Sequence, residues 1–270
     1  MSPAMSTPAF FARRTYWWLE ARRAFGPRTA FALAAGVALL AATQAAIPAL
    51  PATATGLLER AFELRGTASL LLLNDHLALY VTLALFAQVE LARVVVGPME
   101  ERQLALLLSK PVGVTEFFVA RAAPVLAAQV ALGAALTLGE RLLVADALAT
   151  STQVTAAGVV AGGAIATALA VAVSALSLAL QVLVGERELG LLVGVVFTFA
   201  PLLGSAVLVY RPDVYEGRPW ARLLTTFPAS LCAHDASLAA AAPWLVLGAA
   251  GLSALALALA ARAFVARDLV

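Results

Sequence analysis

Apolar runs long enough to cross a membrane follow one another along most of this chain of 270 residues. A helix of about 20 residues rises about 30 Å, which matches the hydrocarbon core of a bilayer. Charged residues make up 13% of the sequence, whereas a soluble domain carries about 25%. The sequence therefore predicts an all-α, polytopic integral membrane protein with a single transmembrane domain over residues 1–270. Its six predicted spans cover residues 29–50, 76–96, 118–138, 154–184, 191–210 and 240–261.

The segment before the first span, residues 9–26, mixes aromatic and basic side chains. Its charges are too many for a membrane-spanning helix, and this mixture is typical of a helix that lies in the headgroup plane. Gly26 and Pro27 end it. We therefore predict an N-terminal interfacial helix, although a juxtamembrane tail that sets orientation would carry the same residues. The side chains expected at the interface are Arg13, Arg14, Trp17, Trp18, Arg22 and Arg23.

Basic residues are unevenly divided between the two ends of the predicted spans. With six spans both termini lie on one side of the membrane, and that side carries most of the 18 Lys and Arg residues. Because short loops rich in Lys and Arg stay in the cytoplasm, we expect both termini to be cytoplasmic in a multi-pass protein of the plasma membrane. The same arrangement makes residues 211–239 an extracytoplasmic segment.

A charged stretch over residues 97–117 interrupts the apolar pattern between the second and third spans. Read as a helix, it has acidic residues in its first turn and a lysine in its last, where the macrodipole favours each charge. Three leucines share one face of it, and a proline stops it. A short helix is marginal alone, so we expect a partner along this face. The residues expected to make that contact are Glu100, Glu101, Arg102, Leu104, Leu107, Leu108, Ser109, Lys110 and Pro111.

The sequence from Glu100 to Val112, Glu-Glu-Arg-Gln-Leu-Ala-Leu-Leu-Leu-Ser-Lys-Pro-Val, resembles the permease subunits of ABC-2 type transporters. In that family an acidic segment, a leucine run and a Ser-x-Pro-Val element follow the second span. An N-terminal interfacial helix, six spans and a polar segment before the last span also match the family's architecture. The resemblance covers nearly the whole chain in architecture and this short stretch in motif.

The resemblance implies the membrane subunit of an exporter that is driven by separate ATP-binding subunits. A dimer of those ATPases would be one partner, with ATP and Mg bound on it, and a second permease copy or a paralogue would be another. Residues 97–117 would be the coupling helix that sits on the ATPase, and residues 9–26 would be the connecting helix beside it. The turn over residues 185–190 would make a second, smaller contact.

The sequence contains no P-loop and no hydrolase or metalloprotease motif. We therefore expect no enzymatic activity, no cofactor and no metal in this chain itself. Cys232, His234 and Asp235 lie close together, but three such ligands in one loop rarely complete a metal shell. Membrane lipid is an expected partner, and nucleic acid is not.

Two ionisable residues, Glu90 and Arg93, fall within the second predicted span at helical spacing. Such residues are functional candidates by default, and these two fit a structural ion pair as well as a gating or substrate role. Asp75 and His76 suit the outer headgroup boundary or a proton relay. An ion-coupled secondary carrier that uses these four side chains is the alternative to the ABC permease, and a non-transporting membrane anchor is a third interpretation. The sequence does not indicate a substrate.

Overall fold

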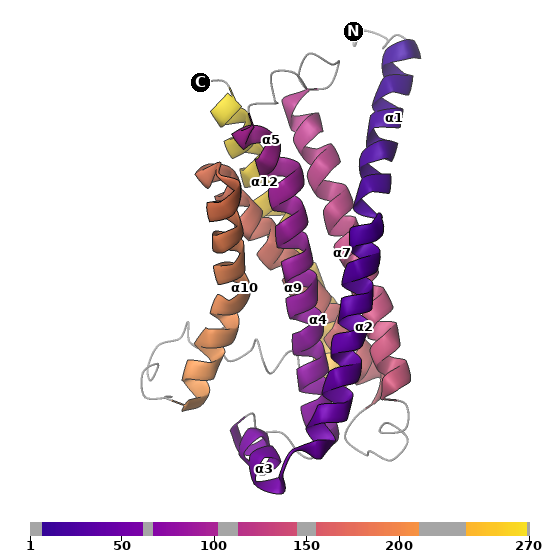
Figure 1. Cartoon of the computed structure of the whole chain (residues 1–270), viewed down its shortest axis with the longest axis vertical. Helices are drawn as coiled ribbons and strands as arrows, with labels where there is room; N and C mark the ends of the chain where they lie inside the picture. The colour runs from indigo at the N-terminus through magenta and orange to yellow at the C-terminus, as the bar shows by residue number, and fades with distance from the viewer. Residues whose placement is uncertain (1–6, 62–66, 102–112, 145–154, 211–235, 269–270) are drawn as a thin grey trace.

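The computed structural model describes residues 7–61, 67–101, 113–144, 155–210 and 236–268, and every regular element in these ranges is helical (Figure 1). The elements are α1 (Thr7–Ala24), α2 (Pro27–Ala46), η1 (Ile47–Ala49), α3 (Ala52–Ala61), α4 (Thr67–Leu91), η2 (Ala92–Val96), α5 (Gly97–Glu100), α7 (Val114–Leu143), α9 (Ala156–Val184), α10 (Arg187–Tyr210) and α12 (Ala236–Asp268). The all-α prediction is confirmed for the described residues.

Five stretches of the described chain are helical, long and apolar enough to cross a membrane. They cover Arg14–Ala49, Ala68–Glu100, Val114–Leu143, Ala156–Val184 and Ala242–Ala266. They contain the predicted first, second, third and sixth spans almost entirely, and most of the fourth. The predicted fifth span, residues 191–210, lies in α10 but is not among these five, so the count of six spans stays a prediction.

The helices that contain the second and third predicted spans, α4 and α7, are longer than those spans. α4 begins at Thr67 instead of residue 76, and α7 runs from Val114 to Leu143 instead of from 118 to 138. Charged side chains were expected to end these spans. Asp75, His76 and Glu140 are instead fully buried inside the bundle, so the helices continue through them because neighbouring helices, and not water, surround these groups.

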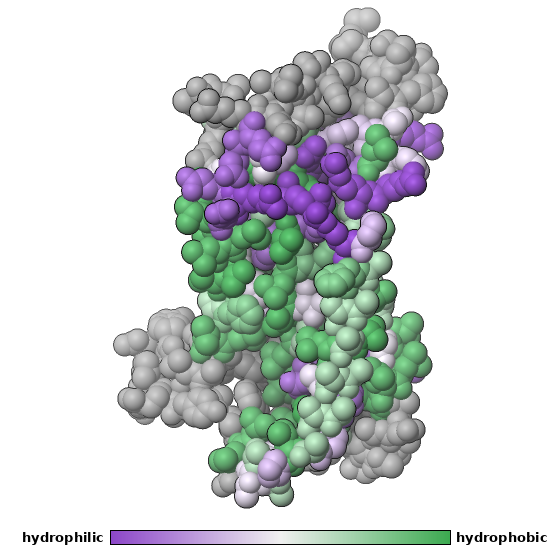
Figure 2. Space-filling view, in the orientation of Figure 1, coloured by the Kyte–Doolittle hydropathy of each residue, from purple (hydrophilic) through white to green (hydrophobic). Residues whose placement is uncertain are grey.

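α4 and α9 form the centre of the bundle. In their most apolar stretches, 72% and 67% of residues are buried, against 17% in the α1–α2 run and in α12. α9 packs against α4, α7, α10 and α12, whereas α2 packs against α4 and α7. An exposed apolar surface covers the outer helices, with a band of hydrophilic residues across the upper part of the molecule (Figure 2). Such a surface is stable in lipid and not in water.

Small residues let α7 and α9 approach closely. An added Cβ at Gly133 would lie 2.3 Å from the Thr167 hydroxyl, and one at Gly163 would lie 2.3 Å from the Thr137 hydroxyl. Each helix thus places one threonine against the glycine of the other. This reciprocal contact agrees with the general use of small residues at membrane helix interfaces.

The sequence explains two helix boundaries, the junction of α1 with α2 and the C-terminal end of α9. Gly26 and Pro27 separate α1 from α2, as expected, and in the view of Figure 1 α1 continues upward from α2. Its position in a headgroup plane stays a prediction. Gly185 ends α9 with a φ of 75°, a left-handed conformation that glycine adopts without strain. The predicted polar turn over 185–190 is shorter than expected, because α10 begins at Arg187.

Candidate functional site

One end of the bundle collects charged side chains from four helices, and we call it the charged end. It is the upper end in Figure 1, where the hydrophilic band of Figure 2 lies. It holds the end of α4, the starts of α2 and α7, and the last turns of α1. Its ion-paired side chains are Glu20, Arg23, Arg28, Glu90, Arg93 and Arg121.

Glu90 is the most buried carboxylate of the charged end, at 4% exposure. Arg93, one helical turn on, donates to one oxygen, and Arg28 at the start of α2 donates to the other at 3.0 Å. The sequence suggested the first contact and missed the second, because Arg28 lies 62 positions away along the chain. Two guanidinium groups thus compensate one carboxylate, and they hold the start of α2 against the end of α4.

Arg121 of α7 connects the same end of α4 to α1. It donates to the carbonyl oxygen of Val94 at 2.8 Å, lies 3.6 Å from a Glu20 oxygen, and stacks 4.6 Å over the Phe117 ring. The Val94 carbonyl is available because Pro98, four residues on, has no N–H to give it. The π-helical turn η2 lies at this position. Proline therefore leaves an acceptor free in η2, and Arg121 of α7 donates to it.

The predicted coupling segment is described at its two ends. α4, η2 and α5 run without a break to Glu101, so Glu100 and Glu101 lie at the end of the incoming helix. Glu100 lies in the first turn of the short helix α5, as expected, and Glu101 follows as its C-terminal cap. Whether a helix continues through the leucines stays a prediction. Outside the described residues lie Arg102, Leu104, Leu107, Leu108, Ser109, Lys110 and Pro111.

Glu100 connects the coupling segment to the start of α10. Its Oε2 accepts a hydrogen bond from the backbone N–H of Arg187 at 3.2 Å. Free N–H groups at a helix start favour an anion, so this exposed carboxylate is well placed. The described start of residues 97–117 therefore contacts residues 185–190, the second segment predicted to touch a partner, through Glu100 and Arg187.

α1 presents basic and aromatic side chains on its exposed face. The Arg22 guanidinium lies 5.3 Å from the centre of the Trp18 ring, and both side chains are exposed. Arg14 and Arg23 are also exposed, and Trp17 is half-buried. Arg13 belongs to α1 with its side chain outside the described part. On the opposite face the sequence missed Glu20, which is 8% exposed and pairs with Arg23 and Arg121.

Buried glutamine and serine side chains join α4, α7 and α9 in the interior of the bundle. The Gln88 side-chain oxygen of α4 accepts hydrogen bonds from Ser177 and Gln181 of α9, each at 2.7 Å. Gln129 of α7 donates to Ser174 of α9 at 3.1 Å. This cluster was missed, although Ser174, Ser177 and Gln181 lie on one helical face at i, i+3 and i+7. Interhelical bonds of this kind hold membrane helices together.

The end opposite the charged end, called here the far end, holds a second group of buried ionisable side chains. Asp75 accepts hydrogen bonds from Thr43, at 2.8 Å, and from Gln44 of α2. His76 lies 3.1 Å from Glu140 of α7, and both are fully buried. Because α2, α7 and α9 enclose them, Asp75 and His76 are shielded from solvent by protein, and their position at a headgroup boundary stays a prediction.

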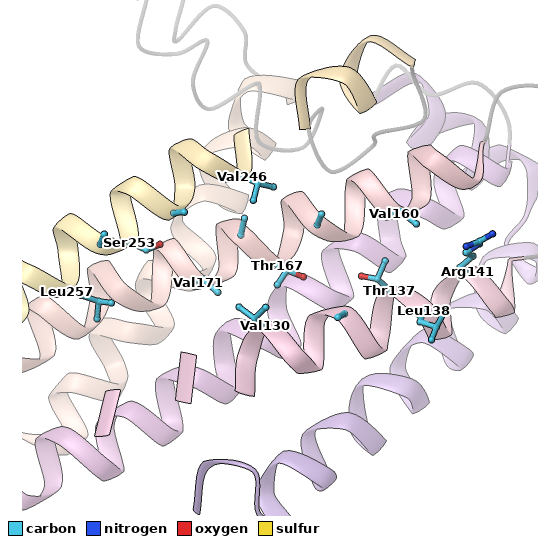
Figure 3. A pocket seen from close by; sticks show the side chains of 15 residues that line it. Val130, Thr137, Leu138, Arg141, Val160, Thr167, Val171, Val246, Ser253 and Leu257 are labelled. Carbon is cyan, nitrogen blue, oxygen red and sulfur yellow. The ribbon is translucent and has the colours of Figure 1, made fainter. Parts of the chain in front are cut away.

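A groove of about 670 Å³ lies between α7, α9 and α12 (Figure 3). Valine, leucine and alanine side chains form its walls, and Arg141 lies at one end. Its hydroxyl groups are turned back to their own helices: Thr137, Thr167 and Ser253 each donate to the carbonyl oxygen four residues earlier. The groove therefore presents an apolar surface. It can hold an alkyl chain or another helix.

The described side chains contain no group of three or more His, Cys, Asp or Glu residues that could hold a metal ion. Cys232, His234 and Asp235 lie outside the described residues. No protein-family model, no curated protein and no solved structure matches this chain. The function proposed below therefore rests on the geometry of the described residues.

Proposed function

We propose that the chain is the permease subunit of an ABC-2 type exporter. Separate ATP-binding subunits, working as a dimer with ATP and Mg, supply the energy, and this chain has no enzymatic activity of its own. A second copy or a paralogue completes the membrane part. In this proposal α10 contains the fifth of six spans, the protein lies in the plasma membrane, and the charged end, with both termini, faces the cytoplasm.

The contact between Glu100 and the start of α10 carries this proposal. It brings together two segments that are far apart in sequence, each expected to touch the ATPase. Both lie at the charged end, which the basic residues assign to the cytoplasm. An ATPase seated there would touch residues 97–117 and the start of α10 at once.

The charged end also offers a route by which force on the coupling segment reaches the spans. The segment before residue 102 is the direct continuation of α4, and Arg121 ties that continuation to α7. Glu100 ties it to α10. A displacement of residues 97–117 therefore acts on α4, α7 and α10 together, and all three pack on α9.

The secondary-carrier alternative relies on four side chains, and the geometry gives two of them a structural role. Glu90 and Arg93, with Arg28, form a compensated ionic contact that holds two helices. Arginine keeps its charge at all physiological pH values, so both cations of this contact are permanent. A carrier mechanism would have to rest on the far end alone.

Replacing the three leucines of the coupling segment tests the proposal. In the variant L104S/L107S/L108S, a P-loop ATPase that co-purifies with the wild-type chain should be lost, while the amount of chain in the membrane stays unchanged. The leucines are expected to fill an apolar cleft on the partner, and serine removes that apolar contact. Co-purification from membranes and quantification of both chains measure the effect.

A matched control changes three leucines at the other end. Leu138, Leu142 and Leu143 of α7 are all exposed and lie at the far end. The variant L138S/L142S/L143S should retain the ATPase at the wild-type ratio. If both variants keep the ATPase, or if the control loses it equally, the coupling assignment does not hold.

A further inference from the structure

Two ionisable side chains that the permease proposal does not use meet at the far end. The Nε2 atom of His76 lies 3.1 Å from Oε1 of Glu140, and both side chains are fully buried. Neither oxygen of Glu140 accepts a hydrogen bond from the part of the chain that the structure describes. Glu140 also lies in the last turn of α7, where the macrodipole disfavours an anion. Its negative charge therefore depends on the contact with His76.

The fold makes room for this contact. An added Cβ at Gly162 would lie 2.0 Å from the His76 ring, so the ring rests on the backbone of α9. The neighbouring Asp75 differs from Glu140 because Thr43 and Gln44 of α2 donate to its two oxygens. Three helices thus enclose the pair of His76 and Glu140, and a fourth fixes the carboxylate beside it.

Few other charged side chains among the described residues lie on the helices around this pair. α9 carries no charged residue between positions 156 and 184. α4 contributes Asp75, α7 contributes the exposed Arg141, and α3, which packs on α4, contributes the half-buried Glu59. No Lys or Arg among the described residues forms an ion pair with Glu140. Within the described residues the pair therefore has no permanent cation to compensate its carboxylate.

We infer that His76 and Glu140 form a proton-binding site that holds one exchangeable proton as a unit. With this proton the pair is neutral overall, whether the proton lies on the ring nitrogen or on the carboxylate oxygen, so the proton belongs to the pair and not to either residue. When the proton leaves to solvent water, one uncompensated negative charge remains in a buried site. Such a charge is costly inside a membrane protein. Loss of the proton therefore loosens the packing of α4 and α7 against α9.

Infrared difference spectroscopy follows both groups in the full-length chain. Spectra are recorded between acid and alkaline pH in phosphatidylcholine nanodiscs, in a His234→Asn background that leaves one histidine. We expect a neutral-carboxyl band and an imidazole band that titrate with one midpoint. Glu140→Gln should remove that carboxyl band and move the imidazole midpoint by at least about tenfold in proton concentration. Asp75→Asn, the matched control, should keep both bands.

Three results would overturn the inference. Separate midpoints for the two bands in the parent spectrum reject a shared proton, and this readout requires no variant at the pair. Retention of the titrating carboxyl band in Glu140→Gln, or its loss in Asp75→Asn, assigns the proton elsewhere. A midpoint that moves with sodium concentration at fixed pH assigns the site to a metal cation. The experiment needs no ATPase, so its outcome is independent of the permease proposal.

Discussion

Glu90 and Glu140 are both buried carboxylates of the central bundle, yet their surroundings differ in kind. Glu90, at the charged end, receives hydrogen bonds from two guanidinium groups. Glu140, at the far end, has one imidazole at 3.1 Å and no hydrogen bond from the described residues. Arginine is always charged, whereas histidine changes charge near neutral pH. The first site is therefore a permanent connection between helices, and the second can switch.

The two ends of the bundle thus differ in role: the contact at the charged end holds helices together, and the contact at the far end responds to pH. The permanent contact lies where we propose that an ATPase applies force, at the point where α2, α4 and α7 must move together. The titratable contact lies where α4 and α7 meet α9 on the other side. This difference can be tested because the partners of each carboxylate can be replaced separately by mutation.

The largest effect is expected from removing both cations of Glu90. The variant R28A/R93A leaves a buried carboxylate without compensation, which costs about 3–5 kcal/mol when a buried pair is broken. Equilibrium unfolding of the purified chain in mixed micelles measures the loss. Neutralising all three groups, in E90Q/R28Q/R93Q, should be clearly milder than R28A/R93A. Equal losses in the two variants would mean that Glu90 is not held by its ion pairs.

A smaller effect is expected from filling the space behind His76. Gly162→Ala places a methyl group against the ring, and overpacking of this kind costs about 1–3 kcal/mol. Gly248→Ala in α12 is the control, since an added Cβ there meets nothing within 4 Å, and it should be neutral or stabilising by up to about 1 kcal/mol. In a His76→Ala background the same Gly162→Ala change should cost clearly less, because no ring then occupies the space. A stable G162A protein would show that the ring does not rest on α9.

The smallest effect is expected where Pro98 frees the Val94 carbonyl for Arg121. Pro98→Ala restores an N–H four residues after Val94, so the carbonyl gains a second donor. The destabilisation caused by Arg121→Met should then be lower by about 0.5–1.5 kcal/mol, the worth of one hydrogen bond. A double-mutant cycle of the two changes measures this coupling. Full additivity would reject the link between the proline and the arginine.

Much of the helical architecture could be predicted from the sequence because hydropathy and length are local properties. The break at Gly26 and Pro27 and the end of α9 at Gly185 follow from backbone chemistry that these residues carry with them. The ends of α4 and α7 were misjudged for one reason. A charged residue such as Glu140 was taken as a sign of water, and a single sequence does not show that another helix buries it.

The long-range partners of the charged groups could not be predicted from the sequence, for a related reason. Glu90 meets Arg28 across 62 positions, and Glu100 meets Arg187 across 87. Such pairs depend on which helices are neighbours, and periodicity within one helix does not contain that information. The contact of Glu90 with Arg93 could be suggested because both lie on α4–η2, one turn apart.

Cross-linking from the coupling segment tests the central claim most directly. A photoreactive amino acid replaces Leu107 in the full-length chain, and irradiation takes place in native membranes. The account predicts a covalent adduct with a polypeptide that binds ATP, and no such adduct from the same group at Leu142, which is exposed at the far end. Absence of an ATP-binding adduct from position 107, or equal adducts from both positions, would contradict it.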